Sequence, residues 1–465
     1  MIPIARRTLL SFVLVCGVVS TAAADKLDDL LKTKMETRKI PGLSLVVVRD
    51  GKVIKSMGYG LANVETETPA TPETVYQLAS VTKQFTATAI MMLAEDGKLT
   101  LDDPITKYLE NVPSAWNAVT VRHLLNHTSG IKSYTEVSGF ATQSHKEVTA
   151  QDIIKIASDQ PADFPPGEKW HYNNTGYYLL GVIIAKTSGK PYDEFLQERI
   201  FRPLEMKSTR LNVNRQVIKK RATGYTVKDG ALCNGDYVSA TQPYAAGALV
   251  STVEDMAKWD KALTDGKLLK KESYTQMWSP TRLKDGKMEK YGFGWSVGDR
   301  NGHREIGHGG GIQGFSTYIG RYPEDKLTVI VLANSDQANA QALANEVAVT
   351  YIPDLAQKPE RAMTEADPKL IAKMGELIRA TAEGKLDWEQ FVPSSRKAIQ
   401  NGAKNAQEAI KSFGKLKEIE MLRQETQGDI KLTFFRLIFA NETLHGVLGL
   451  NKEGKIASIG MMPGS

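Results

Sequence analysis

The order of apolar and polar positions predicts an antiparallel sheet whose strands come from two distant parts of the chain. Residues 43–48 and 53–59 are apolar runs joined by Arg49-Asp50-Gly51-Lys52, and an Asp-Gly turn between such runs is typical of a β-hairpin. Three further apolar runs predict strands at 292–297, 314–319 and 327–332.

Segments with helical spacing of apolar residues separate the hairpin from these later strands. An antiparallel sheet flanked by helices and interrupted by a helical subdomain indicates an α+β fold, in which a site lies between the sheet and that subdomain. The expected helices are at 85–93, 120–126, 150–158, 177–186 and 192–200.

The chain changes character after about Tyr351, where prolines interrupt a charged stretch. We interpret 353–367 as a linker and 368–465 as a small C-terminal α+β domain that follows a main domain at 25–352. No motif there indicates a function, so the small domain is interpreted as a structural or partner-binding appendage of unknown partner. Its expected helices are at 370–381 and 403–412, and its expected strands at 419–424, 430–439, 444–450 and 456–459.

The first 24 residues have the pattern of a secretory signal peptide. Arg6 and Arg7 precede an apolar run at 9–19, and Ala22-Ala23-Ala24 is a small-residue cleavage site before Asp25. The run is short for a membrane span of about 20 residues, which favours cleavage over an uncleaved anchor. We therefore expect a periplasmic or secreted protein with no stable membrane anchor after cleavage.

Composition narrows the possible classes of protein. A chain of 465 residues exceeds what one core usually holds, so at least two domains are expected. The net charge of +6 is modest, and no basic cluster with interleaved aromatic residues is present, which argues against nucleic-acid binding. Cys16 lies in the signal segment and leaves Cys233 alone, so no internal disulfide is expected.

Ser80-Val81-Thr82-Lys83 is the strongest candidate for chemistry. Three residues along a helix bring a hydroxyl and an amine onto one face, and a serine needs such a neighbour to become a nucleophile. An extended stretch before Ser80 and a helical run after Lys83 put the serine near a helix N-terminus, where free N–H groups stabilise an oxyanion. Alone, the pattern also fits a capped surface helix, because it recurs at Ser129/Lys132, Ser394/Lys397 and Ser412/Lys415.

Two rarer patterns follow. Tyr172-Asn173-Asn174 is the one place where a tyrosine has asparagine two positions on, although a loop aromatic and a turn residue would look the same. A glycine run opened by His308 leads into the expected strand and allows close approach of a ligand, or it is simply a turn before that strand. His123 and His127 lack a metal-binding pattern, so we expect structural hydrogen bonds at a helix end and no metal.

These motifs, in this order, resemble the serine β-lactamases, the penicillin-binding proteins and the related esterases and D-amino-acid peptidases. The resemblance is to the class C-like, peptidase S12-like branch and covers roughly residues 40–335. Family order is Ser-x-x-Lys, then Tyr-x-Asn, then Lys-Thr-Gly or His-x-Gly. The supporting phrases lie at 79–86, 124–130, 164–167 and 174–181.

The resemblance implies a role for each candidate. Ser80 would form an acyl-enzyme, and a cationic Lys83 beside Tyr172 would favour the phenolate, so that the pair shuttles the proton. Asn174 would hydrogen-bond Lys83 or a substrate amide, and the N–H groups of Ser80 and Gly311 would form the oxyanion hole. The implied substrate-binding and oxyanion residues are Asn174, His308, Gly310 and Gly311, with no cofactor.

His308 replaces the lysine that is frequent in the third motif. A histidine is mostly neutral at pH 7, whereas β-lactams and D-Ala-D-Ala peptides both present a carboxylate. We therefore favour a hydrolase of esters or small peptides and amides over a β-lactamase or D-Ala-D-Ala carboxypeptidase. Two alternatives belong to other classes of protein. One is a sensor that binds penicillin or peptidoglycan without turnover, and the other is a scaffold whose C-terminal domain carries the function.

Overall fold

The computed structural model describes residues 21–213, 215–356 and 360–463, which form two compact units, one ending at Ala356 and one beginning at Gln357. Most of the expected signal peptide, residues 1–20, lies outside the described residues. Helix α1 (Thr21–Arg38) spans the expected cleavage site, and Leu27 and Leu31 of this helix are buried. Among the described helices, none is both long and apolar enough to cross a membrane.

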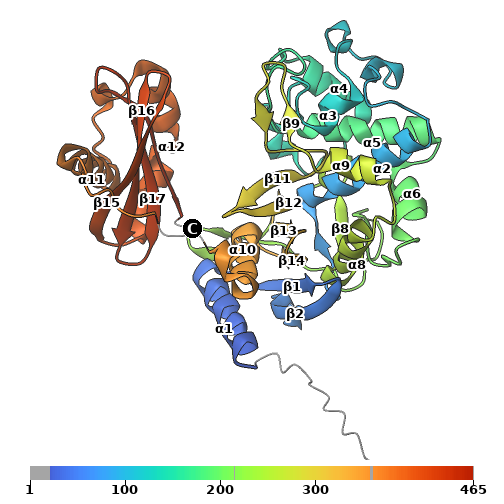
Figure 1. Ribbon diagram of the computed structural model, residues 1–465, viewed down its shortest axis with the longest axis horizontal. Coiled ribbons are helices and arrows are strands. Elements are labelled where there is room, and N and C mark those ends of the chain that lie inside the picture. Colours follow the sequence, from blue (N-terminus) through green and yellow to red (C-terminus); the bar gives the residue numbers. More distant parts are fainter. Residues whose placement is uncertain (1–20, 214, 357–359, 464–465) are drawn as a thin grey trace, which may run out of the picture. The chain divides into compact units, whose positions relative to one another are not determined.

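An antiparallel seven-stranded sheet forms the centre of the first unit (Figure 1). Its order is β11-β12-β13-β14-β1-β2-β3, so strands from near residue 45 lie beside strands from near residue 330. This confirms the expected hairpin and the predicted α+β fold. The bounds are β1 Gly42–Arg49, β2 Lys52–Asn63, β3 Thr68–Pro69, β11 Ser296–Arg300, β12 His303–Ile312, β13 Phe315–Tyr322 and β14 Leu327–Ala333.

The central strands β1, β13 and β14 are buried on both faces, and their successive side chains point to opposite sides of the sheet. In β1, Leu43, Leu45 and Val47 belong to one buried cluster with residues of helices α1 and α10 (Ala340–Tyr351). Figure 1 shows these two helices next to the sheet. Val46 and Val48 face the other core, which holds α2 (Thr82–Glu95) and α8 (Val253–Thr264). The sheet is thus a rigid support with the helical part of the unit on one side.

The helical part follows the predicted spacing closely and surrounds α2. Several short two- and three-stranded pairings connect it to the sheet. The remaining helices are α3 Val121–Leu125, α4 Ala150–Ser158, α5 Asn174–Ser188, α6 Tyr192–Leu196, α7 Tyr244–Gly247 and α9 Lys271–Met277, and the short strands are β4 Tyr76–Gln77, β5 Arg210–Leu211, β6 Tyr225–Lys228, β7 Ala231–Asn234, β8 Leu249–Ser251, β9 Thr281–Arg282 and β10 Met288–Glu289.

Two sequence expectations differ from the structure. The strand expected at 292–297 begins only at Ser296, because Gly294 adopts φ 75° in a turn closed by a hydrogen bond from Gly292 N to Trp295 O. The glycine run after His308 is not a turn leading into a strand, because it is itself the second half of β12. Pairing of β12 with β11 ends at Gly307, which leaves the following residues paired with β13 alone.

The second unit is a four-stranded antiparallel meander with two helices, as its sequence predicts. Alternate residues of β16, including Phe435 and Leu437, are buried against Met374 and Leu377 of α11. Helix α12 begins already at Pro393, earlier than the expected 403. The bounds are α11 Pro368–Glu383, α12 Pro393–Ser412, β15 Leu416–Gln427, β16 Ile430–Phe439, β17 Thr443–Leu450 and β18 Ile456–Pro463.

Candidate active site

Ser80 lies in a single 3-10 turn, Ala79–Val81, between strand β4 and helix α2. Ala79 adopts φ 47°, a left-handed conformation that is uncommon for a residue with a Cβ and that clusters at functional sites. Thr317 of β13 holds the turn by donating its hydroxyl to Leu78 O at 2.8 Å. The serine hydroxyl is therefore presented at the N-terminal end of α2 by a backbone fixed from the sheet.

Lys83 is completely buried one turn further along α2. Its Nζ lies 3.1 Å from Ser80 Oγ, 2.9 Å from Asn174 Oδ1 and 2.8 Å from Ala246 O. Two of these partners are fixed acceptors, whereas the serine hydroxyl can also donate. A neutral Lys83 amine can accordingly donate to Asn174 and Ala246 and accept the proton of Ser80.

The Tyr-x-Asn motif lies across the start of α5. Asn173 caps the helix by accepting from Gly176 N at 2.7 Å, which places Asn174 in the first turn beside Lys83. The side chain of Asn174 also donates to Thr135 Oγ1 at 3.1 Å. The ring centre of Tyr172 lies 4.8 Å from Lys83 Nζ. The structure therefore brings Tyr172 and Asn174 together with Lys83 and Ser80.

Burial of Lys83 and Tyr172 opposes the ammonium–phenolate pair that the family resemblance implies. Burial lowers the pKa of Lys83 well below its ordinary value of 10.5. Burial also raises the pKa of Tyr172 above 10.0, and a hydrogen bond with Ser80 opposes that rise only in part. Because a buried amine and a buried phenol are both neutral more easily than charged, the site favours the neutral pair.

His308 is buried in β12, and both of its ring nitrogens already have partners. Nε2 lies 2.8 Å from the hydroxyl of Tyr291, and Nδ1 lies 2.6 Å from Gly309 O. Burial, with a smaller contribution from Lys83, lowers the pKa of His308 to about 3. The imidazole is therefore neutral and engaged within the fold, and it offers no cation to a substrate carboxylate.

The glycines of β12 lie against the Ser80 turn. A Cβ on Gly310 would stand 2.2 Å from Leu78 O and 2.4 Å from Thr317 Oγ1, so a side chain there would displace the strand. Gly311 has open space beside it and lines a cavity together with Ser80 and Asn174. The strand therefore approaches the Ser80 turn closely only because Gly310 lacks a side chain.

The cavity over Ser80 has a volume of about 210 Å³ and is lined without an ionisable Asp, Glu, Lys, Arg or His. Lys83, Tyr172 and His308 are not among the lining residues. Uncharged amides and hydroxyls alternate with apolar groups on the wall. The lining residues are Ala79, Ser80, Tyr134, Thr135, Phe140, Ser144, Asn174, Val238, Gln242, Pro243, Ala246, Gly247, Gly311, Ile312 and Gln313.

Three contributors to the site were not found by sequence reasoning. Tyr291 engages His308, Thr135 holds the Asn174 amide, and Ala246 supplies a carbonyl to Lys83. Ala246 can reach Lys83 because α7 packs closely on α5, where a Cβ on Gly181 would lie 2.4 Å from that of Ala245. This glycine lies in the family-like phrase 174–181, and it was the sequence signal for the close packing of α7 on α5.

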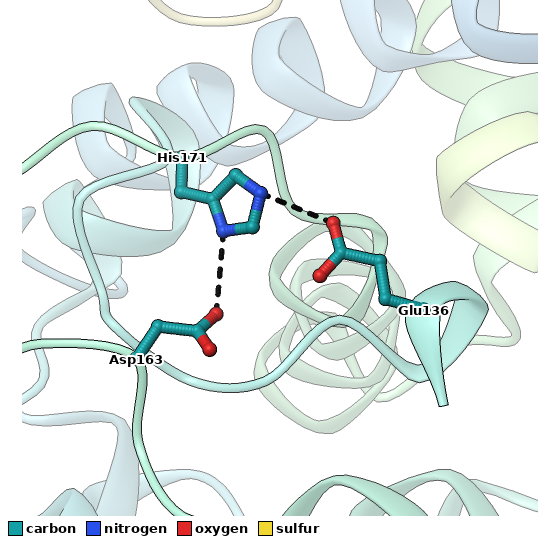
Figure 2. Close-up of side chains that lie close together, drawn as sticks. All are labelled: Glu136, Asp163 and His171. Atoms are coloured by element: carbon teal, nitrogen blue, oxygen red, sulfur yellow. Dashed lines mark hydrogen bonds and ion pairs between the residues drawn. The ribbon is translucent and has the colours of Figure 1, made fainter. Parts of the chain in front are cut away.

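Glu136, Asp163, His171 and Lys132 form a polar cluster, and Figure 2 shows the first three. His171 Nε2 lies 3.1 Å from Glu136, and its Nδ1 lies 3.2 Å from Asp163. Lys132 Nζ reaches the same carboxylates at 2.8 and 3.2 Å. The two carboxylates lie on opposite sides of the imidazole and are already paired with Lys132. This arrangement connects two loops, and it resembles an ion-pair network more than a metal site.

Comparison with known proteins agrees with this geometry. A family model described as Beta-lactamase matches residues 27–351. Penicillin-binding protein 4* of Bacillus subtilis (strain 168) is 33% identical over 327 residues, which cover 67% of this chain and 72% of that protein.

Two solved structures are also similar. The octameric penicillin-binding protein homologue from Pyrococcus abyssi has a TM-score of 0.65 and 25% identity, over 95% of this chain and 98% of that one. The D-amino acid amidase from Ochrobactrum anthropi SV3, complexed with L-phenylalanine amide, has a TM-score of 0.63 and 28% identity, over 72% and 99%. The resemblance inferred from the motifs is confirmed, and the chain belongs to the beta-lactamase family, whose members are generally serine hydrolases.

Proposed function

We propose that this protein hydrolyses small uncharged esters or amides through an acyl-enzyme on Ser80. The observation that carries the proposal is the contact between Lys83 Nζ and Ser80 Oγ at 3.1 Å, at the base of a cavity lined by uncharged groups. Nucleophile and base within such reach, with the base itself oriented by Asn174, form the arrangement that covalent catalysis requires. The expected signal peptide supports action in the periplasm or outside the cell.

Acylation begins with the neutral amine of Lys83. It takes the proton of Ser80 as Oγ forms a bond to the substrate carbonyl carbon, and the carbonyl oxygen becomes an oxyanion. We assign stabilisation of that oxyanion to the N–H groups of Ser80 and Gly311, and loss of one such donor typically costs ~10²–10³ in rate. Tyr172 then gives its proton to the leaving oxygen or nitrogen and recovers one from Lys83, so the proton balance closes.

In deacylation, water is the nucleophile and Ser80 is the leaving group. Lys83, again neutral, takes a proton from the water as its oxygen attacks the acyl carbon. The bond from that carbon to Ser80 Oγ breaks, and the proton returns to the serine. Lys83 is the base in both half-reactions, as expected for an active site in which the serine is hydrogen-bonded to its base before the substrate arrives.

The charge of the cavity favours uncharged substrates. A carboxylate beside the scissile bond would find no cation in the cavity lining, and a free α-ammonium group would find no carboxylate. Transfer of either charge from water without a partner is unfavourable. The similarity to a D-amino acid amidase makes amides a second substrate class to compare with esters.

We expect kcat/KM for p-nitrophenyl butyrate to exceed that for p-nitrophenyl hemisuccinate and for p-nitrophenyl 4-aminobutyrate at least about tenfold, because only the first is uncharged. Steady-state rates at pH 7.5 measure this directly. The same assay includes a D-phenylalanine anilide and a chromogenic cephalosporin. Faster turnover of the cephalosporin than of the butyrate would reverse the proposal, and a permanent penicillin adduct without product release would indicate a sensor.

The pH dependence identifies the base. We expect kcat/KM on the butyrate ester to rise with pH along a limb whose midpoint lies below 10.5, because burial lowers the pKa of Lys83 and only the neutral amine accepts a proton. His308, with a pKa of about 3, contributes nothing to this limb.

A tyrosine variant separates the two assignments of the base. A neutral pair and an ammonium–phenolate pair bind the same number of protons, so the wild-type limb belongs to the pair as a whole. In Tyr172→Phe the limb should persist at a reduced rate if Lys83 is the base. A flat pH profile in Tyr172→Phe would assign the base to the phenolate instead.

A further inference from the structure

Two of the phrases that carry the family resemblance are hydrogen-bonded to each other. Backbone bonds join Asp163 N to Gly130 O at 2.8 Å and Gly167 N to the carbonyl of residue 128 at 2.8 Å. The side chain of Asn173 also donates to Ile131 O. The segment at 127–131 is therefore the support on which the chain from Asp163 to the Tyr-x-Asn motif lies.

His127 holds the tyrosine of that motif from both sides. Its carbonyl accepts from His171 N at 3.0 Å, and its ring Nδ1 accepts from Asn173 N at 3.1 Å. These are the residues directly before and after Tyr172. The imidazole ring itself lies against the Tyr172 ring with 4.5 Å between the centroids. One residue thus fixes the backbone on either side of the phenol and one of its faces.

The conformation of His127 is matched to this task. It adopts φ 62°, a left-handed conformation in which histidine is enriched among residues with a Cβ, directly after helix α3. Because Nδ1 accepts a bond from Asn173, the ring proton belongs on Nε2, a buried atom with no partner among the described groups. A buried N–H group without a hydrogen bond costs free energy of folding, and an apolar side chain at this position would avoid that cost.

We propose that His127 is a positioning residue that sets the place of the Tyr172 hydroxyl relative to Ser80. The proposal rests on the function proposed above and extends it to a residue that touches no reacting atom. His127 is absent from the cavity lining, so its influence on the reaction passes through Tyr172 and not through substrate contacts. A displacement of about 1 Å at a reacting group can cost roughly 10²-fold in rate.

The surroundings keep the imidazole neutral. His127 is fully enclosed, and burial is the main cause that lowers its pKa well below 6.5. The charged or titratable groups that face it add to this effect, namely Lys83 from α2, His308 from β12 and His171 from the supported segment. The rings of Trp170, Tyr177 and Tyr291 also lie against it. A protonated ring would direct two N–H groups at each other and lose the bond to Asn173.

Substitutions at His127 separate its two side-chain contacts. His127→Asn keeps an acceptor for Asn173 N and suits the left-handed backbone, His127→Phe keeps the ring face, and His127→Ala keeps neither. On p-nitrophenyl butyrate we expect kcat to fall about 10²-fold in the alanine variant and about tenfold in each of the others, with KM within about twofold. This split between kcat and KM is what a positioning role requires.

The matched control is His123→Gln, four residues before His127. His123 caps α3 together with Thr120, and glutamine fills the same capping position, so the rate should stay within about twofold of wild type. The proposal is overturned if folded His127→Ala retains kcat within threefold of wild type. It is equally overturned if neither His127→Asn nor His127→Phe recovers activity over the alanine variant.

A second measurement does not depend on turnover. In the full chain labelled with ¹⁵N-histidine, we expect His127 to show an unprotonated Nδ1 and a protonated Nε2 at every pH from about 5.5 to 8.5. Titration of this ring to the imidazolium within that range, or a proton on Nδ1, would overturn the proposal even if no substrate is found. Absence of hydrolysis with the expected tautomer present would count against the proposed function alone.

Discussion

Replacement of Ser80 by alanine is expected to lower kcat on p-nitrophenyl butyrate by on the order of 10⁴-fold or more, because no bond to the acyl group can then form. Lys83, Asn174 and the β12 edge remain in place, so substrate binding should change little. Steady-state kinetics measure the loss. Intact-protein mass spectrometry with a slowly released ester should show an acyl adduct on the wild type and none on the variant.

The chain offers a matched control for this experiment. Ser412 is also followed by lysine three positions on, and its hydroxyl is exposed and donates to Ala409 O at the end of α12. Ser412→Ala should therefore keep the full rate. If Ser80→Ala hydrolyses the ester at more than about a tenth of the wild-type rate while folded, the acyl-enzyme proposal is wrong.

Local spacing explains why part of the site could be predicted from sequence. Ser80 and Lys83 lie one helical turn apart, so their contact follows from α-helix geometry once the helix is recognised. The fold class followed in the same way, from the Asp-Gly hairpin and the alternating apolar runs that the seven-stranded sheet confirms. In the second unit, the strand expected at 430–439 has the observed bounds of β16.

Other parts depend on contacts between distant segments, which a local pattern does not show. The glycine run after His308 has the composition of a turn, yet it is a strand because β13 pairs with it and the Ser80 turn fills the space beside it. Tyr291 and Ala246 have no motif of their own. The protonation states were also beyond the sequence, because burial of Lys83 and Tyr172 decides them.

Lys83 variants are expected to show the second large effect. Lys83→Met keeps much of the side-chain volume and removes the base, and we expect kcat on the butyrate ester to fall about 10³-fold. Asn174 and Ala246 lose their common donor, so part of the effect will appear as lower thermal stability. Circular dichroism and a melting curve recorded with each assay separate unfolding from lost chemistry.

Lys83→Arg distinguishes a base from a fixed positive charge. A guanidinium stays protonated at every accessible pH, so it can stabilise a phenolate on Tyr172 but cannot accept the proton of Ser80. If the neutral amine is the base, the arginine variant should be as inactive as the methionine variant up to pH 10, with no recovery as the pH rises. A folded arginine variant with a tenth or more of the wild-type rate would show instead that a cation beside Tyr172 is sufficient, and the phenolate would become the base.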